Sequence, residues 1–192
     1  MKYLLSFLLF GLSYITLSQV NGDFNVICWH LSEGLANSDF VGKPDSNFVT
    51  SSGNKASAVS SLYLNIYSNH KERFVVEVCF DRLKSWMKED SHLLLQHEQI
   101  HFNIYELHAR NLRKSLDSLG YISSHKYYLV DILVNNTYNK IDDMNTKYDR
   151  ETWHGIIKSQ QLRWNNEVLK GLIKLESYQI KSNMCTCTSG EE

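Results

Sequence analysis

Alternating apolar and polar residues mark two segments in the first half of the chain, residues 61–67 and 73–80. Such alternation places the apolar side chains on one face of a strand. The apolar positions on that face are Leu62, Leu64, Ile66, Phe74, Val76, Val78 and Phe80. A short polar stretch joins the two segments, so the pattern predicts an antiparallel hairpin. An earlier segment, residues 24–31, is rich in β-branched and aromatic residues and predicts another strand.

The stretch between these strands, residues 42–60, is rich in Gly, Ser and Asn and contains the only proline. It predicts a long loop or a poorly formed edge strand. At Asp90 the spacing of apolar residues changes from the alternation of a strand to the spacing of a helix. From there a helical pattern runs without proline for about thirty residues, with Asp90 or Ser91 as its cap and Gly120 as its stop signal. We therefore predict a long helix.

The second half of the chain is less uniform. Residues 126–155 allow strand or helix in their first part, and their second part is polar and rich in turn-forming residues. A helical spacing then returns, and it predicts a second long helix near the C-terminus. The apolar and inward-facing positions of that helix are Ile157, Gln161, Trp164, Val168, Leu172 and Leu175. Strands followed by helices predict a small α+β domain, in which an antiparallel sheet precedes both long helices.

The N-terminus has the pattern of a secretory signal. Lys2 precedes an apolar run at residues 3–17, which small and polar residues follow. A spanning helix needs roughly 20 apolar residues, so this run favours a cleaved signal over a membrane anchor. We predict a signal peptide at residues 1–18, a domain at residues 19–182 and a polar tail at residues 183–192. The mature protein is then expected to be exported, periplasmic or secreted, without stable membrane insertion.

Charge and cysteine content narrow the picture further. The formal net charge of −1 gives no indication of nucleic acid or of an anionic membrane as a partner. The four cysteines are Cys28, Cys79, Cys185 and Cys187. In an exported protein they can form disulfides, but four cysteines allow three pairings and the sequence does not choose among them. A metal site at the Cys-x-Cys of the tail is a less favoured alternative.

The first long helix contains His97, Glu98 and His101 in the pattern His-Glu-x-x-His. Helical residues four apart are rotated by about 40° and lie one turn apart, so both imidazoles can reach one ion. Glu98 is rotated by about 100° from His97, where its carboxylate reaches a water on the metal rather than the metal. The pattern therefore predicts a Zn²⁺ site with two histidine ligands and Glu98 as general base.

The alternative is that these are ordinary polar positions on a helix surface. However, Leu94, Tyr105 and Leu112 share their helix face, which indicates that the face is buried. Burial of two histidines and a glutamate without a bound partner is costly, and this favours the metal site.

A catalytic zinc ion requires a third protein ligand. His108 lies on the same face but seven residues beyond His101, or about 10.5 Å along the axis. It is therefore expected to be a core residue or to support the site without binding the ion. Glu106 points about 180° away from His97, and we expect it at the surface.

The remaining candidates lie in the stretch "YDRETWHG", residues 148–155, just before the second long helix. His154 is the preferred third ligand, followed by Glu151 and then Asp149. The acids could instead cap the following helix. Tyr148, or an arginine such as Arg150, is a candidate to stabilise a developing oxyanion.

Three blocks of the sequence carry a family resemblance: "CFDRLKSW", "HEQIHFNIYELHARNLR" and "YDRETWHGIIKSQQLRWNNEV". Together they resemble a bacterial family of predicted secreted zinc-dependent proteases with a domain of unknown function. The likeness covers roughly residues 74–175. It implies a zincin-like fold, His97 and His101 as ligands, Glu98 as catalytic acid and base, and His154 as third ligand. The family supplies no substrate.

These observations lead to the hypothesis of an exported zinc metallopeptidase acting on a peptide or protein. A strand, for example within residues 74–80, is expected to hold the extended substrate by strand addition. Two alternatives remain: a zinc hydrolase acting on a cell-wall or other amide, and a binding module in which zinc only joins two helices. Glu98 argues against the last, because a purely structural site has no use for a carboxylate beside its first ligand.

Overall fold

The structure is a computed structural model that describes residues 25–44, 56–67, 73–120 and 127–187. The predicted signal peptide lies outside the described residues, as does the central part of the polar stretch at residues 45–55. No helix within the described part is long and apolar enough to cross a membrane.

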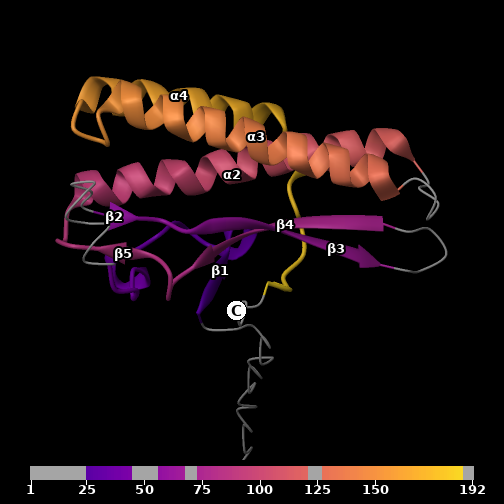
Figure 1. The fold of residues 1–192 in the computed structure, drawn as a ribbon, viewed down its shortest axis with the longest axis horizontal. Coiled ribbons are helices and arrows are strands. Elements are labelled where there is room, and N and C mark those ends of the chain that lie inside the picture. The colour runs from indigo at the N-terminus through magenta and orange to yellow at the C-terminus, as the bar shows by residue number, and fades with distance from the viewer. Residues whose placement is uncertain (1–24, 45–55, 68–72, 121–126, 188–192) are drawn as a thin grey trace, which may run out of the picture.

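The main sheet has three antiparallel strands, and β4 (Arg73–Asp81) is its centre (Figure 1). β3 (Ser60–Tyr67) pairs with β4 along its whole length, with Leu62 opposite Val78, so the predicted hairpin is confirmed. β1 (Val26–Cys28) pairs with the other edge near the end of β4.

Four further short elements accompany this sheet: η1, η2, β2 and β5. The predicted first strand ends early, because a 3-10 helix, η1 (Trp29–Leu31), directly follows β1. A second 3-10 helix, η2 (Asn37–Asp39), lies in the following connection. The end of the polar stretch forms β2 (Ala56–Ser57), which pairs antiparallel with β5 (Trp86–Met87) in a separate two-stranded sheet.

The predicted first long helix is α2 (His92–Leu119). Its N-cap is Ser91, whose hydroxyl accepts a hydrogen bond from the Leu94 amide at 3.4 Å. It ends at Gly120, whose φ of 65° suits glycine. Both boundaries agree with the capping and stop signals of the sequence.

The ambiguous segment of the sequence is a helix, α3 (Tyr127–Thr152). The spacing between its buried residues alternates between seven and four positions, so they form one stripe along the helix. This stripe is narrow, because it contains only about one residue per helical turn or fewer. The stripe consists of Val130, Thr137, Ile141, Tyr148 and Thr152. Asn, Asp and Thr have modest helix propensity, and their abundance hid the helix. α4 (Lys158–Lys174) is the predicted C-terminal helix, and a 3-10 helix, η4 (Glu176–Tyr178), follows it.

These elements form layers, and α2 lies between the sheet and the α3–α4 pair (Figure 1). One side of α2 packs on β4, where Phe102 and Leu112 meet Val78 and Phe80 in one core cluster. On the other side, a second cluster joins α2 to α3 and α4. Its buried members are Ile100, Ile104, Tyr148, Trp164, Val168 and Leu172. The predicted α+β class is confirmed, with three α-helices rather than two in the described residues.

The expectation that Glu106 lies at the surface is wrong, because α2 is covered on both sides. Its side chain is only 1% exposed and pairs with Arg110 and Arg113, each at 2.9 Å. The guanidinium groups continue to backbone oxygens of other elements, from Arg110 to Leu172 at 2.6 Å and from Arg113 to Val76 at 2.8 Å. This buried ion cluster connects α2 to α4 and to β4.

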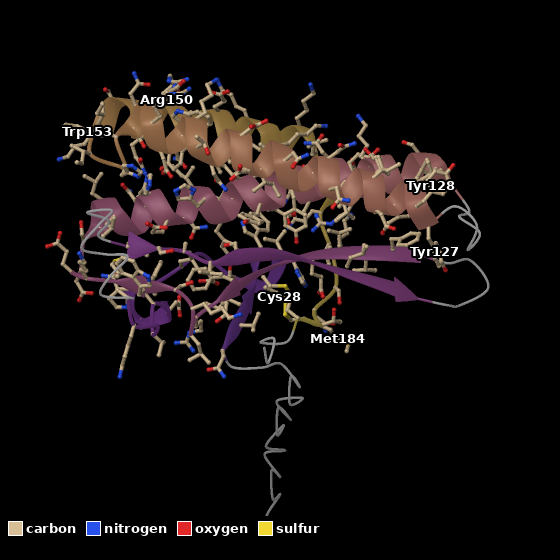
Figure 2. All side chains as sticks on the ribbon, viewed as in Figure 1. Cys28, Tyr127, Tyr128, Arg150, Trp153 and Met184 are labelled. Atoms are coloured by element: carbon tan, nitrogen blue, oxygen red, sulfur yellow. A yellow bond between two sulfur atoms is a disulfide. The ribbon has the colours of Figure 1, made fainter. Side chains whose placement is uncertain are left out.

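The C-terminal tail crosses from the helix layer to the opposite side of the sheet (Figure 1). Two disulfides hold it there, Cys28–Cys185 and Cys79–Cys187; Figure 2 shows the sulfur atom of Cys28 on that side. Cys28 and Cys79 face each other in the β1–β4 register, so the tail is attached to two neighbouring strands. Buried Glu77 adds a hydrogen bond from the Thr186 amide at 3.1 Å. Disulfides of this kind are compatible with an exported protein.

We expect the double substitution Cys79→Ser/Cys187→Ser to lower the free energy of unfolding by about 2–4 kcal/mol, because a disulfide restricts the unfolded chain. Urea denaturation measures the effect, and Met184→Ser, at an exposed position of the same tail, is the matched control. Peptide mapping of the wild type under non-reducing conditions is expected to recover both pairings. An unchanged urea midpoint in the double variant contradicts a stabilising role for the Cys79–Cys187 disulfide.

Candidate metal centre

Two helices, α2 and α3, and the loop that follows α3 surround a cleft of about 580 Å³ at one end of the molecule. The N-terminal half of α2 contributes His97, Glu98 and His101 to its lining, and the C-terminal end of α3 contributes Asp149. β2 lines the cleft as well, through its small side chains. The candidate site residues on the first helix therefore lie in the same cleft as the end of α3, whose structure the sequence left open.

The side chains of His97, His101 and Asp149 meet at nearly equal distances, and we call them the ligand triad. Oδ1 of Asp149 lies 3.0 Å from Nε2 of His97 and 3.0 Å from Nε2 of His101. The two Nε2 atoms are 3.1 Å apart. In a tetrahedral site with metal–ligand distances near 2.0–2.1 Å, the ligand atoms lie about 3.3 Å from one another. The observed triangle is within a few tenths of an ångström of that spacing.

Amide oxygens behind the two imidazole rings determine how the rings present their nitrogens. Nδ1 of His101 lies 2.9 Å from Oδ1 of Asn145, and Nδ1 of His97 lies 3.4 Å from Oε1 of Gln161. An amide oxygen only accepts hydrogen bonds, so both contacts require the proton of a neutral ring to be on Nδ1. Nε2 of each ring then points its lone pair toward the other ring and Asp149. Ligating histidines are typically oriented in this way.

When both rings are neutral, three acceptor atoms converge with no proton donor between them. Oδ1 of Asp149 is buried and lies 3.0 Å from both ring nitrogens, so its partner at this point is either a proton on a ring or a cation. Such an arrangement is unfavourable unless a cation or a proton occupies the centre. Two neutral imidazoles and a carboxylate are ligands that divalent metals prefer. The ligand triad therefore fits a metal ion.

The short distances within the triad also shift the pKa values of Asp149 and His101. Burial raises the pKa of Asp149, but the adjacent His101 and His97 rings outweigh it and hold this pKa well below its ordinary value. Burial lowers the pKa of His101, whereas the contact with Asp149 and the charge of Glu98 bring the net pKa above its ordinary value. A protonated histidine is therefore the competitor of a metal ion at this place.

Glu98 lies in the cleft beside the triad and is only 4% exposed. Burial raises the pKa of its carboxyl, while the charges of His101 and His97 and a backbone hydrogen bond from Ala58 oppose the shift. The two carboxyl groups of the site thus differ: Glu98 has a raised pKa, and Asp149 has a lowered one. Divergent pKa values of neighbouring acids are typical of groups with separate chemical roles.

Tyr148, which the sequence offers as a candidate to stabilise a developing oxyanion, lies against His97. Its ring is fully buried and stacks on His97 at a centroid distance of 4.7 Å. Its hydroxyl donates a hydrogen bond to Oε1 of Gln161 at 2.8 Å, and burial raises its pKa. Tyr148 therefore supports His97 from behind, and its predicted oxyanion role stays a prediction. Arg150 is exposed (Figure 2).

Of the three candidates for the third ligand, the structure brings Asp149 closest to the histidines. His154 also lines the cleft, but its side chain is 60% exposed and its Nδ1 lies 3.7 Å from Oδ1 of Asp149. Its ligand role stays a prediction. Glu151 faces α4 instead, where its Oε2 accepts a hydrogen bond from Nε1 of Trp164 at 2.9 Å. Both acids belong to the last turn of α3, so neither caps α4.

The loop between α3 and α4, residues 153–157, touches the site directly. Gly155 has a φ of 82°, and a Cβ at this position would come within 3.1 Å of Cβ and Cγ of His97. Glycine is therefore required here both for the backbone conformation and for the close approach. This explains the glycine of the "WHG" stretch, which the sequence pattern had left without a role.

Sequence reasoning missed Asn145 and Gln161, the residues that orient the two histidines. Gln161 was expected only as a buried position of the C-terminal helix, and Asn145 lies in the segment whose structure was ambiguous. The available signal was Gln161, a polar residue at a position of the C-terminal helix that the apolar spacing places inside. His108, by contrast, lies away from the triad, with Nε2 3.3 Å from Sδ of Met144.

Comparison with known proteins gives one family. Residues 79–155 match the model of a family described as a bacterial protein of unknown function, DUF922. The matched region begins in β4 and ends at Gly155, so it contains the ligand triad and Glu98. No curated protein sequence and no solved structure matches the chain. The match supports the likeness to a bacterial family of unknown function, and the family description assigns no activity.

Proposed function

We propose that the chain is an exported zinc-dependent metallopeptidase, with His97, His101 and Asp149 as metal ligands and Glu98 as general base. The observation that carries this proposal is the convergence of two ring nitrogens and one carboxylate oxygen at 3.0–3.1 Å from one another. Asp149 replaces the preferred His154 as third ligand because its oxygen already occupies the position opposite both ring nitrogens.

A zinc ion at this site, when bound, acts as a Lewis acid that polarises a carbonyl group and makes water easier to deprotonate. Glu98 takes the proton from the attacking water and passes it to the leaving amine. Its raised pKa suits this role, because a carboxylate with a higher pKa is a stronger base. Asp149, with its lowered pKa, remains anionic as a ligand requires.

Residues behind the triad keep its geometry constant during the reaction. Asn145 and Gln161 hold the two rings by their Nδ1 atoms, and Tyr148 fixes Gln161 from the other side. Each of these residues comes from α3 or α4, whereas the histidines come from α2. The packing of three helices therefore determines the site, and a rigid site avoids reorganisation when the substrate binds.

We propose that an extended substrate binds at a different strand from the one that the sequence indicated. β4 is the central strand of its sheet and none of its residues lines the cleft, whereas Ala56 and Ser57 of β2 do. Ala58, which follows β2, forms the backbone hydrogen bond with Glu98. We therefore assign the binding of an extended peptide to the β2 region, where small side chains leave room for another backbone.

Metal removal tests this proposal. Purified protein is expected to contain one metal ion per chain, and chelation is expected to abolish hydrolysis of a broad peptide mixture. One equivalent of Zn²⁺ restores the activity. The measurement combines metal analysis with mass spectrometry of the peptides.

The alternatives give different results in the same experiment. Stoichiometric metal with hydrolysis of cell-wall amides but of no peptide supports the second hydrolase class. Stoichiometric metal with no hydrolysis of either substrate supports a metal that only joins α2 to α3. Folded protein that binds no metal at all contradicts the proposal in every form.

A further inference from the structure

One wall of the cleft is apolar and exposed. Trp153 and Ile156, both in the α3–α4 loop, line the cleft, and 65% and 61% of their surfaces are exposed. Figure 2 shows Trp153 at the outer end of this loop. Partly buried Leu93 and Leu94 from the first turn of α2 line the same cleft. The wall therefore adjoins the ligand triad and presents large apolar side chains to solvent.

The backbone of the loop is strained where it presents these side chains. Trp153 and His154 have φ values of 49° and 52°, in the left-handed region that residues other than glycine rarely adopt. Burial of Trp153 does not compensate for this conformation, because its side chain is largely exposed. Residues with such strained backbone conformations cluster at active sites and ligand-binding sites of proteins.

The loop is also fixed in place. The Ile157 amide donates to the Thr152 carbonyl at 2.9 Å, and the Gly155 amide donates to the Thr152 hydroxyl at 3.2 Å. Gly155 packs directly against His97. Trp153 and Ile156 thus have a defined position relative to the ligand triad, and an apolar group entering the cleft meets a surface that is already ordered.

We propose that Trp153 and Ile156 form a specificity subsite for a large apolar side chain, aromatic or branched aliphatic, next to the peptide bond that is cleaved. The inference rests on the proposed peptidase function and names the class of peptide that the cleft accepts. Indole rings bind aromatic side chains by offset or edge-to-face packing and by burial of apolar area. Trp153 alone could bind a cation, but the aliphatic Ile156, Leu93 and Leu94 beside it favour an apolar occupant.

The first experiment compares cleavage products of a diverse peptide mixture. Wild-type enzyme is expected to favour bulky apolar residues at one position beside the scissile bond by about tenfold or more over small or acidic residues, a typical discrimination for an apolar pocket. Trp153→Ala is expected to bring this ratio to within about threefold of unity, and Trp153→Phe is expected to retain most of it. Leu162→Ala is the matched control, because Leu162 is 62% exposed on α4 and does not line the cleft.

The second experiment measures binding without turnover. In the Glu98→Gln background, calorimetry compares two peptides that differ only by Phe or Ala at the preferred position. Trp153→Ala is expected to raise the Kd of the Phe peptide about tenfold and to leave that of the Ala peptide unchanged. A preference that survives Trp153→Ala, or a preference for basic residues, overturns the inference. Cleavage of peptides without side-chain preference also overturns it and leaves the peptidase proposal intact, whereas absence of any cleavage overturns both.

Discussion

Replacing Asp149 with alanine is expected to weaken metal binding by more than about 100-fold, whereas His154→Ala is expected to retain one metal ion per chain. Loss of a residue that only supports a ligand typically costs about 10–100-fold in metal affinity, and loss of a direct ligand exceeds this. Oδ1 of Asp149 lies 3.0 Å from both ring nitrogens, whereas the His154 side chain is 60% exposed. Competition titration with a chelator of known affinity measures the difference.

The control for this substitution is Glu151→Ala, which removes an acid two residues away on the same helix. Glu151 faces Arg163 and Trp164 instead of the cleft, so its removal is expected to leave metal affinity unchanged. Thermal unfolding with and without Zn²⁺ gives a second readout, because a ligand that binds only the folded state stabilises it. If His154→Ala loses the metal and Asp149→Ala keeps it, the third ligand is the histidine that the sequence favoured.

The substitution Glu98→Gln is expected to reduce peptide hydrolysis by about 10²–10⁴-fold, the usual contribution of a general base, while the metal stays bound. Glutamine preserves the volume of the buried side chain and an acceptor for the Ala58 backbone, but it cannot take a proton from water. Steady-state assays with a metal-loaded variant measure the loss, and metal analysis is performed on the same sample.

Glu167→Gln is the matched control for this second substitution. It makes the same chemical change at an exposed position of α4, where the side chain is 55% exposed and paired with Arg163. Its activity is expected to equal that of the wild type. Hydrolysis by Glu98→Gln within a few-fold of the wild-type rate assigns the general base to another group, and loss of metal from this variant places Glu98 among the ligands.

The relation of His97, Glu98 and His101 to one another was predictable because it is local. Helix geometry determines the rotation and the rise between positions four apart, and the cap at Ser91 and the stop at Gly120 defined the helix that contains them. The hairpin was predictable for a similar reason, since alternation determines which face of each strand is buried. The structure agrees with both predictions.

The third member of the ligand triad, Asp149, was not predictable in the same way. Asp149 approaches the two histidines only because α3 continues as a helix to Thr152 and packs along α2. The sequence left the structure of that segment open, so the direction of each side chain between residues 148 and 155 was undetermined. His154 was preferred on ligand chemistry alone. The structure shows that the backbone turns at Trp153 and leaves this histidine largely exposed.

The burial of the second side of α2, where Glu106 lies, could not be predicted from the sequence either. Glu106 was expected at the surface because one apolar face normally packs against one partner layer. Two layers cover α2, and its second side accommodates a carboxylate only because Arg110 and Arg113 pair with it. An isolated helical pattern carries no information on how many neighbours the helix has.

The sequence by itself determined the hairpin, two of the three long helices among the described residues, and the presentation of two imidazoles and an acid at one helical turn. Each of these features depends on neighbours within a few residues. Tertiary structure alone decided that Asp149 completes the triad, that Asn145 and Gln161 orient its rings, and that Cys28 pairs with Cys185 and Cys79 with Cys187. These contacts join residues from 44 to 157 positions apart. Helix packing and the path of the tail bring them together, and local sequence patterns specify neither.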